Sequence, residues 1–379
     1  KSPRAEPGSQ QAMADSSQFT FFHWGIHAWA VYGIVAMALA SFGFRKEEKY
    51  LLSVTLKPLF GTKTDGWLGY INDIITLVAT VIGVATTLGF GAIQINGGVS
   101  YLNHKAIPNE MWVQGINIVV TTGLFVLSAL SGLCKGIKIL SNVNMVLAIV
   151  LLAIAIVVGP TVKIFDNMTE SIGLYLHEFF GMSFRTAAFN GGERSWIDTW
   201  TIFYWAWWIS WSPFVGIFIA RISKGRSIRE FITVVLLIPT VLSFIWFSAF
   251  GTMANTAQQG GANLTGLEDE EMLFGTFSHY PLGMLMSIIA IILIFTFFIT
   301  SADSATYVLS MLSEDGKLIP TNGKKVVWGA IVAGIAMALL FAGGLKALQS
   351  TLIIIALPFA VVIALIVVAL IVEVYHEKV

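Results

Sequence analysis

The chain is dominated by long runs of apolar residues with almost no charge inside them. The clearest of these runs are Val143–Val158, Ser287–Ile299 and Leu352–Val372. About 20 such residues cross a bilayer as a helix, because a helix satisfies its own backbone hydrogen bonds in lipid. Only 12% of the 379 residues are charged, which is about half the share of a typical soluble domain. We therefore predict an all-α integral membrane protein.

The apolar pattern predicts nine membrane-spanning helices. They are expected at Phe21–Phe44, Tyr70–Ile95, Met111–Leu133, Ile139–Val162, Asp198–Ile222, Ile228–Phe250, Pro281–Thr300, Val326–Ala342 and Leu348–Val374. Residues 1–20 are polar, and we expect a loose external loop there, before the first span. Residues 166–197 mix apolar side chains with His177, Glu178 and Arg185, so this stretch is too polar to span. We predict that it is an amphipathic helix lying in the membrane interface.

The loops between the spans alternate in charge. Arg45–Gly69 contains five Lys or Arg residues and Arg221–Glu230 contains four, whereas Thr252–Tyr280 has none and carries four acidic residues. Basic loops stay on the cytoplasmic side of the membrane. This places the segment before the first span outside. If the natural N-terminus is cytoplasmic, an odd number of further spans is expected upstream of Lys1.

Several classes of protein fit the composition poorly. One cysteine, Cys134, leaves no pair for a disulfide within the chain, and a net charge of zero suggests no nucleic-acid partner. No catalytic Ser/His pattern, zinc-protease pattern or pair of intramembrane carboxylates is present, so we expect neither an enzyme nor a cofactor. A channel would need a ring of charged or carbonyl groups along a pore, and nothing in the sequence suggests one. His23 and His27 have a metal-ligand spacing, but without a third ligand we interpret them as packing or hydrogen-bonding residues.

The most informative feature is a tryptophan cluster inside the fifth expected span. Five of the twelve tryptophans fall within twelve residues: Trp200, Trp205, Trp207, Trp208 and Trp211. Tryptophan normally marks the membrane interface, and a cluster this deep in a span is unusual for that role. Indole faces attract quaternary ammonium ions through the ring quadrupole, by roughly 0.5–2 kcal/mol for a desolvated contact. Both a cation cage and simple aromatic packing remain open at this point.

Residues 200–216, Trp-Thr-Ile-Phe-Tyr-Trp-Ala-Trp-Trp-Ile-Ser-Trp-Ser-Pro-Phe-Val-Gly, continue into the basic loop that ends at Glu230. This segment resembles the signature of the betaine/carnitine/choline transporter family. Other segments are similar to the family as well: Phe22-His-Trp24 with Trp29 and Tyr32, Gly132-Leu-Cys-Lys-Gly136, Leu140-Ser-Asn-Val-Asn-Met145 and Phe297-Phe-Ile-Thr-Ser-Ala-Asp-Ser304. The resemblance covers nearly the whole chain, and it is far more specific for the family than for the substrate.

The resemblance implies twelve spans and a bundle of two inverted five-helix repeats, of which this chain holds nine spans. Residues 21–165 would be the remainder of the first repeat, with four spans. Residues 198–374 would be the second repeat, with five spans, and residues 375–379 would begin a cytoplasmic tail. The connecting helix over residues 166–197 would correspond to the element that members often use in homotrimer contacts.

The resemblance also implies a secondary active transporter in the cell (inner) membrane that imports a quaternary-ammonium solute such as glycine betaine, choline or carnitine. An exchanger of the same solutes and an osmosensing membrane protein remain alternatives. The implied substrate cage consists of Trp24, Trp29, Tyr32 and Trp208, with Trp207 and Trp211 along the route to it. Because Trp24 lies five residues before Trp29, we expect an irregularity in their helix.

Sodium is the expected coupling ion. By resemblance, Phe297, Thr300 and Ser301 would form half of a sodium site, at a helix break where the seventh span ends. Local capping of a helix end by Ser and Asp is the alternative explanation for these polar residues. A second sodium site, known in some members, would use Thr80 and Phe214, but Val84 stands where its second hydroxyl would be. The second span contains no Lys or Arg, which favours ion coupling over exchange.

Overall fold

We describe the protein from a computed structural model, over residues 2–6, 8–130 and 134–376. Every regular element in these ranges is a helix, which confirms the predicted fold class. Eight segments are long and apolar enough to cross a membrane: Gln10–Arg45, Trp67–Leu102, Met111–Ser128, Lys138–Val158, Gly191–Ile222, Ile228–Gln259, Gly283–Leu312 and Asn322–His376. Residues 131–133 and 377–379 lie outside the described residues. The first group belongs to the expected third span and to the segment 132–136 that resembles the family, and the second belongs to the expected tail.

The nine expected spans correspond to these eight segments because the last segment is kinked. Helix α14 (Asn322–His376) contains two residues with non-helical backbone angles, Gly343 and Gly344. Gly344 has φ 56°, a left-handed conformation that glycine adopts without a steric penalty. The eighth and ninth expected spans therefore lie on the two arms of α14, before and after this kink.

Helix α1 (Gln10–Trp24) corrects the expectation of a loop over residues 1–20. The helix begins directly after Ser9, whose side chain accepts a hydrogen bond from the backbone N–H of Ala12 at 3.2 Å. Such a cap satisfies one of the free donors at a helix start. Gln18 is buried and donates to the carbonyl of Leu174 at 3.1 Å. Polar side chains that look typical of a loop therefore cap this helix or bond to its neighbours.

The expected amphipathic helix over residues 166–197 is instead three short helices. They are α7 (Thr161–His177), α8 (Phe179–Ser183) and α9 (Gly191–Trp196). Helix α7 starts after Pro160, which directly follows the end of α6 (Cys134–Val158) and Gly159. Ala187, between α8 and α9, has a positive φ of 50°, which a continuous helix does not allow. Helix α7 buries one side, including Ile164 and Tyr175, and contacts α1 and α11 (Ile228–Gln259).

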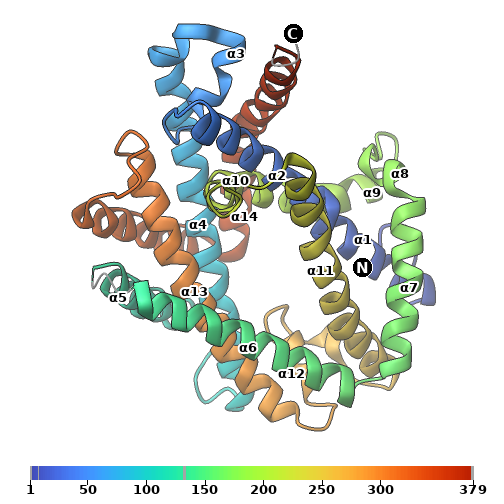
Figure 1. The fold of residues 1–379 in the computed structure, drawn as a ribbon. Coiled ribbons are helices and arrows are strands. Elements are labelled where there is room, and N and C mark those ends of the chain that lie inside the picture. The colour runs from blue at the N-terminus through green and yellow to red at the C-terminus, as the bar shows by residue number, and fades with distance from the viewer. Residues whose placement is uncertain (1, 7, 131–133, 377–379) are drawn as a thin grey trace.

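The central core is formed by α2 (Ile26–Ala40), α4 (Trp67–Leu102), α10 (Ile202–Ile222) and α14. Figure 1 shows α3 (Lys57–Phe60) and the C-terminus at one end of the molecule and α12 (Met272–Phe277) at the other. Helices α5 (Met111–Leu130) and α6 follow one another across the lower half of the view in Figure 1, and α13 (Gly283–Leu312) contacts both.

The basic loops lie close to one another: Lys224 of the Arg221–Glu230 loop lies over the ring of Phe44, directly before the Arg45–Gly69 loop, at 5.5 Å from its centroid. Lys49 pairs with Asp315, and Lys46 pairs with Glu373 near the end of α14. On the opposite end, the amide of Asn109 donates to Glu270 of the acidic loop at 2.7 Å. The basic loops thus gather at one end and the acidic loop at the other, as alternating charge along the chain predicts. That the basic end is cytoplasmic remains a prediction.

Candidate functional site

The site begins with an interruption between two helices. Helix α1 ends at Trp24 and α2 starts at Ile26, and Gly25 between them has φ −93° and ψ −144°. A Cβ atom on Gly25 would lie 2.5 Å from the carbonyl oxygen of Phe21 and 3.1 Å from a ring carbon of Phe244. Glycine is therefore the residue that fits this break, which supplies the helix irregularity expected from the sequence.

The break brings the side chain of Trp24 close to Trp208, together with those of Trp29 and Tyr32. In an unbroken helix, side chains five residues apart would point about 140° away from each other. Here the Trp208 ring centroid lies 5.3 Å from that of Trp24, 5.9 Å from that of Trp29 and 4.8 Å from that of Tyr32. The pairs are tilted or edge-on, as aromatic rings prefer. Four residues expected to form a cage therefore do come together.

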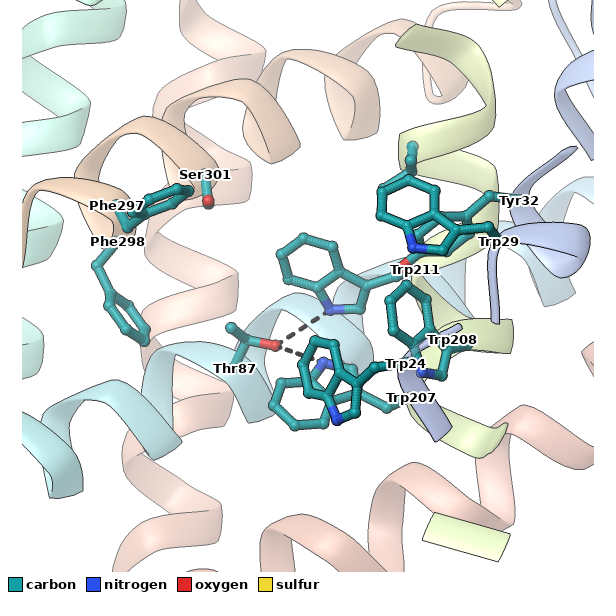
Figure 2. A pocket seen from close by; sticks show the side chains of 11 residues that line it. Trp24, Trp29, Tyr32, Thr87, Trp207, Trp208, Trp211, Phe297, Phe298 and Ser301 are labelled. Carbon is teal, nitrogen blue, oxygen red and sulfur yellow. Dashed lines mark hydrogen bonds between the residues drawn. The ribbon is translucent and has the colours of Figure 1, made fainter. Parts of the chain in front are cut away.

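These rings line a cavity of about 450 Å³ (Figure 2). Its walls come from α1–α2, α4, α10 and α13, and its lining consists of Trp24, Trp29, Tyr32, Thr87, Trp207, Trp208, Trp211, Val215, Phe297, Phe298 and Ser301. None of these side chains carries a charge. A cavity of this size suits a small solute, and its aromatic faces suit a cation that lacks N–H donors.

Trp207 and Trp211 are held by one hydroxyl that the sequence analysis did not assign to the site. Their indole N–H groups donate to Oγ1 of Thr87 at 3.0 and 3.1 Å (Figure 2). Thr87 in turn donates to the carbonyl of Gly83 at 3.0 Å. A threonine bonded to its own helix is an ordinary feature of membrane spans, so nothing in the sequence indicates this role. Val215 and Phe298 of the lining were missed because apolar side chains are equally ordinary inside a span.

The expected sodium ligands on α13 lie on an unbroken helix. The expectation that the seventh span ends near Thr300 is wrong, because α13 continues to Leu312. The hydroxyl of Thr300 lies 3.1 Å from the Thr296 carbonyl oxygen and 3.0 Å from that of Phe297. Ala302 and Asp303 are buried in the continuation, so packing favours the longer helix. Phe297 and Ser301 line the cavity and Thr300 does not.

The residues of the second expected sodium site are both in the interior. Thr80 is fully buried in α4 and Phe214 is nearly so in α10. The Thr80 hydroxyl donates to the carbonyl of Thr76 at 2.8 Å, and Val84 is buried in the apolar core. The polar groups at this position are therefore already paired within α4.

Comparison with known proteins decides the family. The model of the betaine/carnitine/choline family of transporters matches residues 1–379. The chain belongs to this family. It is a multi-pass membrane protein of the cell membrane, and a transporter rather than an enzyme.

Three relatives show how far the similarity extends. The chain is 55% identical to the glycine betaine transporter OpuD of Bacillus subtilis, over 97% of this chain and 72% of that protein. It is 40% identical to the ectoine/hydroxyectoine transporter of Virgibacillus pantothenticus, over 96% of this chain and 72% of the relative. It is 38% identical to glycine betaine transporter 1 of Vibrio parahaemolyticus, over 98% of this chain and 72% of the relative.

Proposed function

We propose that this protein imports a quaternary-ammonium solute, with glycine betaine as the first candidate, by ion-coupled alternating access. The observation that carries the proposal is the convergence of Trp24, Trp29 and Tyr32 on Trp208 around an uncharged cavity. A trimethylammonium group has no N–H donor, so a carboxylate offers it charge but no hydrogen bond. Aromatic faces match both its diffuse charge and its apolar methyl groups.

Glycine betaine ranks first because the relative at 55% identity is named a glycine betaine transporter. Choline and carnitine carry the same cationic head and remain candidates. The relative named for ectoine and hydroxyectoine is more distant, at 40% identity. Ectoine has a ring with N–H groups instead of a quaternary head, and a lining with few acceptors favours it less.

Sodium is the coupling ion in this proposal, bound in part by Phe297, Thr300 and Ser301. The support is that Phe297 and Ser301 line the same cavity as the aromatic cage, so an ion there would be close to the solute. Helix α4 contains no Lys or Arg that could replace the ion's charge. A second site at Thr80 and Phe214 has weaker support, because Val84 brings no oxygen.

The proposed assembly follows the family. Residues 21–165 and 198–374 would belong to two inverted repeats, and α7–α9 would join them and take part in homotrimer contacts. Inverted repeats explain why a solute site lies between helices from both halves of the chain. Cross-linking of the purified full-length protein in detergent would test the trimer, and a product of monomer mass alone would contradict it.

Uptake by the full-length protein tests the function. Cells lacking their own transporters for these solutes would be given labelled glycine betaine, choline, carnitine or ectoine, with and without a sodium gradient. We expect saturable glycine betaine uptake that needs sodium. Uptake only when cells are preloaded with a solute of the same class would favour the exchanger. Regulation by osmolality without measurable transport would favour the osmosensor, and ectoine uptake alone would refute the quaternary-ammonium assignment.

A further inference from the structure

The break at Gly25 creates a second helix start in the middle of a span. The first amide groups of a helix have no partner within it, and in a bilayer interior such groups must be satisfied by other parts of the protein. The hydroxyl of Tyr175, on α7, lies at this helix start, 2.9 Å from Nδ1 of His27 in the first turn of α2. Tyr175 is completely buried. A side chain distant in sequence thus contacts the first turn of α2.

The His27 side chain joins this turn to two neighbouring helices. Its Nδ1 lies 2.9 Å from the Tyr175 hydroxyl and its Nε2 lies 2.7 Å from the hydroxyl of Ser183, on α8. Ser183 donates its own proton to the carbonyl of Phe179 at 2.6 Å, so it accepts from Nε2–H. Nδ1 then accepts from Tyr175. This directional assignment follows from the hydrogen-bond network.

Aromatic rings pack closely around this contact. Phe244 of α11 lies with its ring centroid 5.6 Å from that of Tyr175 and 4.0 Å from that of Phe21. Phe244 is also the residue that a Cβ on Gly25 would approach. Three helices therefore close around the break and hold α2 at a fixed position.

The segment before the break is held by a different partner. His23 Nε2 lies 3.1 Å from the hydroxyl of Thr201, just before α10. Its ring stacks on Tyr204 at a centroid distance of 4.8 Å. Trp24 is thus fixed relative to α10, and Trp29 is fixed relative to α7–α8. A displacement of α7–α8 would move one side of the cage against the other.

We propose that Tyr175 and His27 are positioning residues that anchor the start of α2 to α7–α8 and thereby set the geometry between Trp24 and Trp29. The inference rests on the proposed function, because the geometry matters for a solute held by those rings. It also gives α7–α8 a role inside the protein, as the element whose position determines the shape of the cage. Neither Tyr175 nor His27 lines the cavity, so both act through other residues.

Hydrogen exchange in the full-length protein tests this anchor without any solute. Tyr175→Phe removes only the hydroxyl, and Tyr280→Phe is the matched control, because the Tyr280 hydroxyl donates to the Met253 carbonyl at 2.8 Å. We expect amides in a peptide covering residues 22–32 to exchange about 3- to 10-fold faster in Tyr175→Phe and unchanged in the control. Unchanged exchange there would overturn the proposal. Acceleration throughout the protein would overturn it too, since the hydroxyl would then support the fold in general.

Solute binding tests the positioning role. Binding of glycine betaine would be followed by tryptophan fluorescence in detergent, with thermal stability measured in parallel. We expect the dissociation constant to rise about 3- to 10-fold in Tyr175→Phe and His27→Leu. His27→Asn keeps an acceptor for Tyr175 and should recover most of the affinity. Equal affinity in all variants would overturn the positioning role. Wild-type protein that does not bind glycine betaine would refute the proposed function instead, and hydrogen exchange would still test the anchor.

Discussion

The two walls of the cavity are built in opposite ways. On the aromatic wall, α1 and α2 are separated by the break at Gly25, and α10 follows a π-helical turn over Ile197–Thr201. On the other wall, α13 runs without interruption from Gly283 to Leu312. The irregular helices redirect their side chains toward one point, whereas the regular helix keeps the Thr300 hydroxyl bonded to its own carbonyls.

This difference indicates how each wall would bind its ligand. Aromatic faces need only be brought together, and the break does this before any solute arrives. Oxygen ligands for a hard cation must give up their present partners or be joined by other oxygens. We therefore expect the aromatic wall to be preorganised and the ion wall to form its site as the ion binds. The following experiments, from the largest expected effect to the smallest, test that contrast in the full-length protein.

Closing the break should have the largest effect. Gly25→Ala places a Cβ 2.5 Å from the carbonyl oxygen of Phe21, so Trp24 and Trp29 can no longer both face Trp208. Loss of two aromatic contacts should weaken glycine betaine binding by about 30- to 100-fold. Gly251→Ala in α11 is the control, because a Cβ there would meet nothing within 4 Å. Wild-type affinity in Gly25→Ala would show that the cage does not depend on the break.

Removal of the central ring should have the next largest effect. Trp208→Leu keeps an apolar side chain but loses the π face, and we expect affinity for glycine betaine to fall by about 5- to 30-fold. Trp208→Phe should lose less. Trp246→Leu is the matched control, since Trp246 packs on Phe250 at a centroid distance of 4.7 Å, outside the cavity lining. Uptake of labelled solute, corrected for protein abundance, measures the change. Equal affinity in Trp208→Leu and wild type would mean that the tryptophans only pack.

Substitutions on the α13 wall, where the ion is expected to bind, should have weaker effects on uptake. Ser301→Ala should raise the sodium concentration for half-maximal uptake by about 3- to 10-fold, because Ser301 lines the cavity and loses one oxygen ligand. Thr300→Ala should raise it less, since that hydroxyl is paired within α13. Thr296→Ala, which removes a hydroxyl bonded to Ile292 at 2.7 Å, should leave it unchanged. Unaltered sodium dependence in the Ser301–Thr300 double variant would exclude this wall as the ion site.

The smallest effect should come from the hydroxyl that orients two outer rings. Thr87→Val keeps the shape of the side chain but removes the acceptor of both Trp207 and Trp211. Trp211 keeps the carbonyl of Gly83 at 3.2 Å, so the rings should shift only slightly. We expect the apparent affinity to fall by about 2- to 3-fold. Thr76→Val, whose hydroxyl donates to Asn72 within α4, serves as the control. A loss as large as that of Trp208→Leu would place Thr87 in direct contact with the solute.

Element boundaries show where inference from the sequence stops. Residues 10–20 read as a polar loop, yet they are helical because Ser9 caps the helix and Gln18 bonds to α7. Ser301 and Asp303 read as a helix end, yet they lie inside α13, because neighbouring helices bury the continuation. Gln18 has its partner far away in sequence, and the continuation of α13 is stabilised by packing against other helices. Local composition carries no information about such partners.

The sequence by itself determined the class of the protein, its family and the set of aromatic residues that could form a cage. It could do so because span length and ring chemistry are properties of residue types, and because the tryptophan signature is specific to the family. Only the tertiary structure decided that Gly25 interrupts the helix, that Tyr175 contacts α2 through His27, and that α13 continues past Thr300. These features depend on which groups meet across more than a hundred residues of chain, such as His27 and Tyr175, 148 positions apart. That is a question of packing between helices, which periodicity along one helix cannot answer.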